Sequence, residues 1–413
     1  MPSRFQSPDI RLLPYPEGKT FAFTIIDDTD GETLESVRPI YDYLFSLGLG
    51  TTKTVWVKNP NQRPVKESDF GDSLERSEYA DYIRLLQHRG FEIALHNVAS
   101  MSSEREQIAA GIADFTRILG QAPKINVHHE KNRENLYFDF AQRGICPPSP
   151  YRTALLRGIH QRLSHNGRPR LLDHSCSGED PQTTYFWGDL CKATIKYVRT
   201  NVFFQDLNTL KCSPQMPYSL AQTPFVNHWF DSSNGQDAQH FNSILSDKNI
   251  ASLRQECGCS ILYTHFGKGF VSRREGSFEL NTETKARLRA VAGHADGWYA
   301  PVGEVLDRLL AFQRITVLPL SGGIVITNHN EFAVHAVTLY TTAGRTFCDL
   351  QGRELAADQA GKIKVPTLSA GESLAIMSSE TAAQARAWNS DLRPAFVLDL
   401  ERLSSKLRQR VDI

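Results

Sequence analysis

Residues 21–30, FAFTIIDDTD, combine a short apolar run with an acidic turn. The run Phe21–Ile26 is β-rich and bounded by turn formers, which predicts a buried strand. Three carboxylates, Asp27, Asp28 and Asp30, come after its carboxyl end. Beyond them, apolar residues recur at helical spacing from Leu34 to Leu47, and a glycine suited to ending a helix comes next. The stretch therefore predicts one β/α unit with acidic residues where the strand ends.

The same unit repeats along the first 130 residues. Strands are predicted at 51–57, 91–95 and 124–127, with amphipathic helices between them. Strands that alternate with helices predict parallel pairing through right-handed crossovers. Polar residues come after two further strand ends, as His96-Asn97 and as His128-His129-Glu130. Because a β/α barrel gathers its active site at the carboxyl ends of several strands, we predict a barrel rather than an open doubly wound sheet.

The rest of the chain divides into three parts. Residues 140–260 carry aromatic patches between turn formers, which indicates long loops inserted into the barrel. A strand at 260–265 ends in His265, and helices are expected near 283–291 and 302–312. From 313 the period changes to two, which is typical of a small antiparallel sandwich. We therefore expect a distorted (β/α) barrel over 1–312, a β-sandwich over 313–380 and a partly helical tail over 381–413.

Composition excludes several classes of protein. The 413 residues include 46 basic and 46 acidic side chains, for a net charge of zero. Without a basic block, a nucleic-acid partner is not expected. The sequence has neither a run of about 18 apolar residues nor an apolar segment at its start, so we expect a cytoplasmic protein without a membrane span. The seven scattered cysteines lack CxxC pairs and are interpreted as reduced thiols.

The acidic turn offers two carboxylates with different surroundings. In an extended segment Asp27 and Asp28 point to opposite sides, so that one could bind a cation while the other acts as a base. Acidic turns are also common for purely structural reasons, and the two interpretations are about equally good from the residues alone. For Asp30 we favour the structural interpretation, in which it belongs to the turn or caps the following helix.

The histidines add metal ligands to this turn. A single histidine such as His96 is weak support for a metal site, but His128 and His129 adjoin at one strand end, where alternation lets only one point inward. One aspartate and two histidines suit Zn²⁺, and also Co²⁺, Mn²⁺ or Fe²⁺. Three protein ligands leave positions open for water and substrate, which is typical of a catalytic site.

Three ordered motifs carry a family resemblance. Thr24-Ile25-Ile26-Asp27-Asp28, then His96-Asn97-Val98-Ala99-Ser100, then Tyr263-Thr264-His265 resemble the motifs of the NodB-homology polysaccharide deacetylases, carbohydrate esterase family 4. The resemblance covers about residues 20–310 and leaves the C-terminal sandwich outside it. It implies a distorted β/α barrel that holds a divalent metal and removes acetyl groups by hydrolysing an amide or ester bond.

The resemblance also implies roles for individual residues. It makes Asp27 the general base, Asp28 and His96 metal ligands, and His265 the general acid. One departure stands out, because Ser100 occupies the place of the family's second histidine. We expect His129 or His128 to supply the missing imidazole. The family's R-x-P-Y segment is represented only by Ala122-Pro123-Lys124 and the residues directly after Lys124.

The expected function is removal of an acetyl group from an N- or O-acetylated sugar, glycan or glycan precursor. Flat aromatic faces beside polar groups suggest sugar contacts in the middle of the chain, at Trp187, Asp189, Arg199, Asn227 and Trp229. A C–N hydrolase acting on a small non-sugar amide and a non-catalytic glycan-binding homologue remain alternatives. A two-carboxylate glycosidase would need a second acid, for which Glu130 is the nearest candidate. The sequence is compatible with a homo-oligomer.

Overall fold

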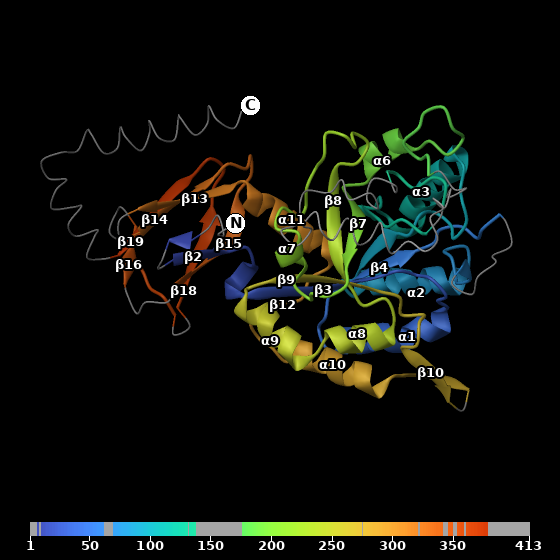
Figure 1. Cartoon of the computed structure of the whole chain (residues 1–413), viewed down its shortest axis with the longest axis horizontal. Coiled ribbons are helices and arrows are strands. Elements are labelled where there is room, and N and C mark those ends of the chain that lie inside the picture. Colours follow the sequence, from blue (N-terminus) through green and yellow to red (C-terminus); the bar gives the residue numbers. More distant parts are fainter. Residues whose placement is uncertain are drawn as a thin grey trace, which may run out of the picture. The chain divides into compact units, whose positions relative to one another are not determined.

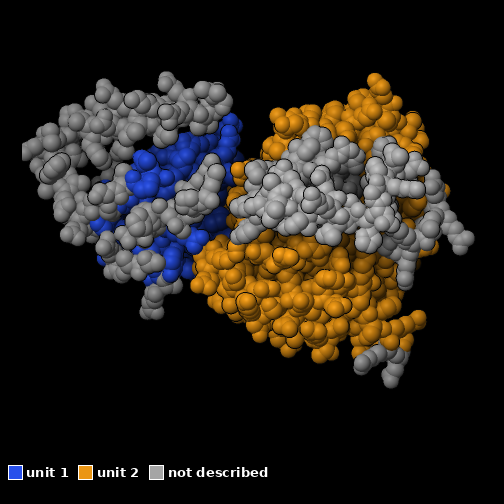
Figure 2. Space-filling model, in the orientation of Figure 1, with its two compact units in different colours: residues 1–18, 311–413 blue, residues 19–310 orange. Residues whose placement is uncertain are grey.

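The computed structural model describes residues 6–7, 10–61, 69–130, 132–137, 176–274, 276–320, 323–341, 346–349, 353–358 and 361–378. The chain forms two compact units, Lys19–Leu310 and a second made of Met1–Gly18 with Ala311–Ile413 (Figure 2). The sequence analysis placed the boundary two residues later and assigned the first 18 residues to the barrel, whereas they belong to the second unit. The predicted tail, 381–413, lies outside the described residues. The segment 138–175, which includes the first part of the predicted inserted loops, also lies outside them.

Seven parallel strands close into a barrel in the described part of Lys19–Leu310 (Figure 1). In order around the barrel they are β3 (Phe21–Asp27), β4 (Thr52–Val55), β5 (Glu92–Leu95), β6 (Ile125–Asn126), β7 (Tyr197–Phe203), β8 (His228–Asn234) and β9 (Cys259–Thr264). Pairing of β9 with β3 closes the barrel, and β12 (Gly297–Trp298) adds in parallel to β3. The predicted barrel class is therefore confirmed.

Helices lie around the outside of these strands (Figure 1). They are α1 (Leu34–Ser46), α2 (Ser77–His88), α3 (Arg105–Leu119), α6 (Gly188–Thr194), α7 (Thr209–Cys212), α8 (Ala238–Ile244), α9 (Asp247–Gln255), α10 (Thr282–Ala292) and α11 (Val302–Gln313). A hairpin of β10 (Val271–Arg274) and β11 (Ser277–Leu280) precedes α10. No helix in the described ranges has the length and apolar character needed to cross a bilayer.

Strand alternation explains which layer each residue of β3 joins. Phe21, Phe23 and Ile25 belong to one apolar core cluster together with Val37, Ile40, Tyr41 and Leu44 of α1. Side chains on a strand alternate between its two faces, so Asp27 continues the face toward the helices and Asp28 the opposite face. This division decides the surroundings of the two carboxylates.

The second unit is built from two antiparallel sheets. One contains β1 (Gln6–Ser7), β2 (Ile10–Leu13), β15 (Val334–Thr341) and β18 (Lys362–Leu368). The other contains β13 (Ile315–Leu320), β14 (Gly323–Asn328), β19 (Ser373–Ser378), β16 (Phe347–Cys348) and β17 (Glu354–Leu355). Leu12, Leu339 and Ile363 of the first sheet share one core with Ile324 and Ile376 of the second. The period-two pattern predicted this all-β unit, but not that β1 and β2 complete it.

Candidate active site

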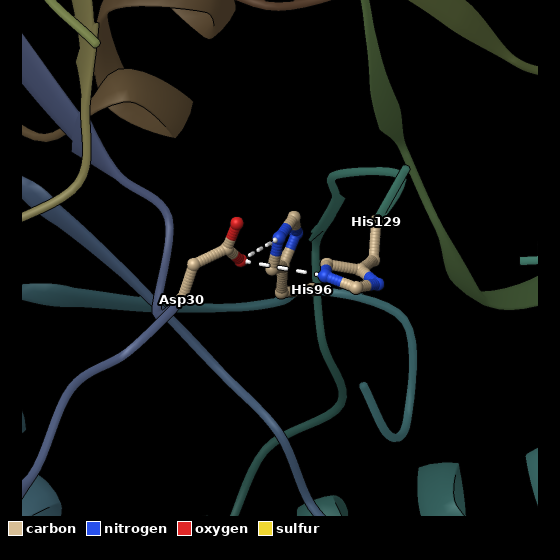
Figure 3. Close-up of side chains that lie close together, drawn as sticks. All are labelled: Asp30, His96 and His129. Atoms are coloured by element: carbon tan, nitrogen blue, oxygen red, sulfur yellow. Dashed lines mark hydrogen bonds and ion pairs between the residues drawn. The ribbon is translucent and has the colours of Figure 1, made fainter. Parts of the chain in front are cut away.

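Three side chains from separate loops converge at the carboxyl ends of the barrel strands. Asp30 lies in the turn after β3, His96 directly follows β5, and His129 follows β6 (Figure 3). Each offers a ligand atom, and these atoms all lie within 4.8 Å of one another. Asp30 Oδ1 is 2.9 Å from His96 Nε2 and 3.7 Å from His129 Nε2. All three side chains are buried. Asp30, His96 and His129 are called the triad below.

The outer nitrogen of each imidazole in the triad has its own acceptor. His96 Nδ1 lies 3.1 Å from the carbonyl oxygen of Val127, and His129 Nδ1 lies 3.3 Å from Asn132 Oδ1. Metal-binding histidines characteristically donate their second N–H to such a partner, which leaves Nε2 free to bind. Burial lowers the pKa of His129, which favours the neutral imidazole that metals require. The donor set and its orientation therefore fit a divalent cation.

Trp56, which directly follows β4, fixes the planes of these two rings. Its indole is stacked on His96, with ring centroids 6.3 Å apart and planes inclined by 12°. The same indole meets the His129 ring edge to face at 5.7 Å. Because Trp56 is itself fully buried, rotation of either imidazole away from Asp30 would require the surrounding core to move.

The second oxygen of Asp30 faces His265, which directly follows β9. Asp30 Oδ2 lies 3.2 Å from His265 Nε2, and His265 Nδ1 lies 2.8 Å from the carbonyl oxygen of Gln236. Tyr263 Oη is 3.2 Å from the same Nε2. Burial alone would raise the pKa of Asp30, but hydrogen bonds from His265 and His96 outweigh it and hold that pKa well below its ordinary value. Asp30 is therefore a carboxylate at neutral pH.

Asp28 is held by Arg199 of β7 through two parallel hydrogen bonds. The guanidinium donates from Nη1 to Oδ1 at 2.8 Å and from Nη2 to Oδ2 at 2.6 Å. The Arg199 guanidinium also lies 4.3 Å from the centre of the Tyr263 ring. Burial would lower the pKa of Arg199, but the charge of Asp28 and its hydrogen bonds raise it. Asp28, predicted as a metal ligand, is thus outside the triad, and Asp30, interpreted as a turn residue, takes part in it.

Asp27 lies in the layer between the barrel and its helices. Its Oδ2 accepts a hydrogen bond from Tyr41 Oη at 2.8 Å, and its Oδ1 accepts one from the Phe266 N–H at 2.9 Å. Lys53 Nζ lies 3.3 Å from Oδ2 and also pairs with Glu32. The Asp27, Lys53 and Glu32 side chains are fully buried. Asp27, predicted as the general base, therefore faces the helix layer rather than the side of the strand that carries Asp28.

The electrostatics of this buried group depend on the lysine. Burial would lower the pKa of Lys53, but the charges of Asp27 and Glu32 raise it well above its ordinary value. Burial raises the pKa of Glu32, and the neighbouring Asp27 adds to that increase. The protonated lysine therefore offsets the cost of placing Asp27 in the core.

The two adjacent histidines have separate surroundings. His129 joins the triad, whereas His128 Nε2 accepts a hydrogen bond from the Leu136 N–H at 3.3 Å, and its ring meets Trp229 edge to face. Burial lowers the pKa of His128 to about 3. Ser100, at the place of the family's second histidine, is buried. Of the two imidazoles expected to replace that histidine, the geometry favours His129.

Most residues predicted to contact a sugar make structural contacts instead. Trp187 and Trp229 are buried, with indole N–H groups that donate to the Glu134 carbonyl and to Thr223. Asp189 is an exposed partner of Arg105. Asn227 precedes β8, at the amino ends of the strands and away from the triad, and donates to two backbone carbonyls. Arg199 alone of the five predicted residues lies at the site.

The sequence analysis missed the loop that comes after His129. Glu134 and Asn132 are buried there, and the Glu134 carboxylate accepts hydrogen bonds from Asn97, Asn132 and Ser103. Burial raises the pKa of Glu134 to about 7. The polar run His128–Asn135, directly after a strand end, was the available signal.

No protein-family model matches this chain, and a search of curated proteins gives no match. Solved structures do match. A Mycobacterium smegmatis protein described as a polysaccharide deacetylase has 13% identity and a TM-score of 0.42, over 76% of this chain and 96% of its own. A Pseudomonas aeruginosa PAO1 protein described in the same way has 12% identity and a TM-score of 0.36, over 73% and 94%. The allantoinase Puue has 12% identity and a TM-score of 0.37, over 73% and 93%.

The buried Lys53 gives a first prediction. Lys53→Met removes the cation and leaves Asp27 and Glu32 facing each other in the core, which should cost about 3–5 kcal/mol of unfolding free energy. Lys58→Met is the matched control, because Lys58 is partly exposed and pairs with Asp114 at the surface, so its loss should cost less than about 1 kcal/mol. Denaturant unfolding monitored by circular dichroism measures both. Equal losses would contradict the proposed role of Lys53.

Glu134 gives a pH prediction. The folded protein keeps the Glu134 proton up to about pH 7, whereas the unfolded chain loses it near the ordinary glutamate pKa of 4.5. Between these values the folded state binds more protons, so raising the pH lowers stability through this group. The difference in unfolding free energy between wild type and Glu134→Gln should therefore change by up to about 3 kcal/mol from pH 4.5 to 7. A pH-independent difference would contradict the raised pKa.

Proposed function

We propose that the chain is a metal-dependent hydrolase that removes an acetyl group from an N- or O-acetylated sugar, glycan or glycan precursor. The observation that carries the proposal is the position of the Asp30 carboxylate. One of its oxygens faces the two imidazoles of the triad, and the other faces His265. A cation site and a proton donor thus share one buried carboxylate at the carboxyl ends of the barrel strands.

Asp30, His96 and His129 are the proposed metal ligands. Two imidazole nitrogens and a carboxylate oxygen suit zinc, and three protein ligands leave a position for water and substrate. When bound, the ion would polarise the acetyl carbonyl and increase the acidity of water. The ordered motifs of the sequence, which resemble those of polysaccharide deacetylases, support an acetylated carbohydrate as the substrate class.

Asp28 is proposed as the general base in place of Asp27. It lies on the strand face opposite Asp27, two residues from the ligand Asp30, and Arg199 holds both of its oxygens. A base held in one orientation can accept a proton from the attacking water without first reorganising. Asp27 keeps a different role, because its contacts with Tyr41, Phe266 and Lys53 anchor the end of β3.

His265 is proposed as the general acid. Its Nδ1–H is directed at the Gln236 carbonyl, so Nε2 is the nitrogen that faces the site. Water adds to the acetyl carbonyl as Asp28 takes its proton, and the C–N or C–O bond then breaks as His265 Nε2 protonates the departing atom. The products are acetate and the free amine or alcohol.

Removing the proposed ligand tests metal binding directly. Asp30→Asn should lose bound Zn²⁺ after purification without chelators, measured by elemental analysis, and should release no acetate from a panel of acetylated sugars, nucleotide sugars and oligosaccharides. Asp189→Asn is the control, because it removes an exposed carboxylate that pairs with Arg105. Full zinc content in Asp30→Asn would reject the ligand assignment. Hydrolysis of small amides without acetate release by the wild type would favour the alternative C–N hydrolase.

The base assignment gives a separate prediction. Asp28→Asn should keep its zinc, because Asp28 is not a ligand, while the turnover number falls by about 10²–10⁴-fold. Both substitutions should cost stability, since Asp28→Asn leaves Arg199 and Asp27→Asn leaves Lys53 facing an amide. Asp27→Asn should nevertheless keep a near-normal turnover number in its folded molecules. Turnover measured about 20 °C below each variant's unfolding midpoint separates these effects, because the folded fraction is then close to one. Near-normal turnover in Asp28→Asn would exclude it as the base.

A further inference from the structure

A buried polar cluster joins the two loops that carry the histidines of the triad. At its centre, Glu134 Oε1 accepts hydrogen bonds from Asn97 Nδ2 at 2.9 Å and from Asn132 Nδ2 at 3.0 Å. Glu134 Oε2 accepts from the Ser103 N–H at 3.1 Å. Glu134, Asn97 and Asn132 are all at most 4% exposed. A carboxyl group whose oxygens accept from three donors in so buried a position holds its partners in one arrangement.

Each amide partner of Glu134 leads to one histidine of the triad. Asn132 uses its Nδ2 for Glu134 and its Oδ1 for His129 Nδ1, which fixes both ends of the amide. Asn97 directly follows His96 and has a left-handed backbone, with φ of 51°. Its Nδ2 binds Glu134 and Asn135, and its backbone N–H donates to the Val127 carbonyl. The same Val127 carbonyl faces His96 Nδ1.

The backbone of Glu134 is anchored independently of its side chain. The Trp187 indole donates to the Glu134 carbonyl at 2.6 Å. Gly178 packs so closely against the same carbonyl oxygen that a Cβ at this position would overlap with it. Asn135 donates to the carbonyl oxygen of His129 at 2.7 Å, which closes the loop between the two residues. The backbone that carries the Glu134 side chain is therefore held in place.

From this geometry we propose that Glu134 is the positioning residue for the metal ligands, acting on His129 through Asn132 and on His96 through Asn97. The proposal rests on the metal site proposed above. The proposal also explains how the site manages with Ser100 in place of the family's second histidine. The replacement ligand, His129, lies on the neighbouring loop and needs support to reach Asp30 and His96. The residues from Asn132 to Asn135 provide that support. Asn132 keeps the proton of His129 on Nδ1, which leaves Nε2 for the ion.

Co²⁺ binding tests this role without requiring a substrate. The metal-free full-length wild type, Glu134→Gln and Asn132→Ala are titrated with Co²⁺, and the visible absorption of the bound ion reports its ligands. Loss of an outer partner of a metal-binding histidine typically costs about 10–100-fold in affinity. We expect losses of that size in both variants, together with an altered absorption spectrum. Because both act on His129, the double variant should lose less than the product of the single losses.

Asp231→Asn is the matched control. Asp231 of β8 is also a buried carboxylate with a raised pKa due to burial, and it accepts hydrogen bonds from Asn201 and Tyr218. The contacts described for Asn201 and Tyr218 do not reach the triad, so Co²⁺ affinity should be unchanged. An equal loss in Asp231→Asn would overturn the positioning role, because any buried carboxylate would then have the same effect.

The outcomes separate this proposal from the metal site on which it rests. A wild type that binds neither Co²⁺ nor Zn²⁺ would overturn the metal site, and the positioning role with it. A wild type that binds Co²⁺ while Glu134→Gln binds equally tightly and with the same spectrum would overturn the positioning role alone. If Glu134→Gln fails to fold, Asn132→Ala decides, and unchanged affinity there would likewise overturn the role.

Discussion

The site depends on the pairing of β9 with β3, which closes the barrel. In this register Asp27 lies opposite Thr264, and the Asp28 N–H donates to the Thr264 carbonyl at 2.8 Å. The Phe266 N–H then donates to the Asp27 carboxylate, across 239 residues of sequence. Closure thus places the acidic turn of the first barrel strand beside the histidine that comes after the last. Without the pairing of β9 with β3, Asp30 and His265 would not be brought close together.

Three carboxylates within four residues lie in three different environments, because side chains alternate between the faces of β3 and the chain then turns. Asp27 continues the face toward the helices and is neutralised by Lys53. Asp28 faces the other way and is held by Arg199. Asp30, beyond the end of β3, meets the two imidazoles and His265. One acidic turn can therefore supply an anchor, a proposed base and a proposed ligand, since side-chain direction rather than residue type separates them.

Much of the architecture was predictable because it depends on local periodicity. The apolar run before Asp27 and the helical spacing after it predicted β3 and α1, and the period-two pattern after 313 predicted most strands of the second unit. The strands before Gly18 were missed. They are short, and only their pairing with β15, far away in sequence, makes them part of a sheet. Sugar contacts at Trp187 and Trp229 were predicted from residue type, but these indoles are buried among core side chains and hydrogen-bonded inside the fold.

The sequence alone determined that polar residues come after the ends of successive strands, and hence which histidines could meet at one end of a barrel: His96, His128 or His129, and His265. Only the tertiary structure decided that Asp30 rather than Asp28 faces the imidazoles, that His129 rather than His128 joins them, and that Glu134 ties their loops together. The physical reason is that periodicity assigns a side chain to a face of a strand, while the loops beyond the strand ends take their direction from hydrogen bonds between residues distant in sequence.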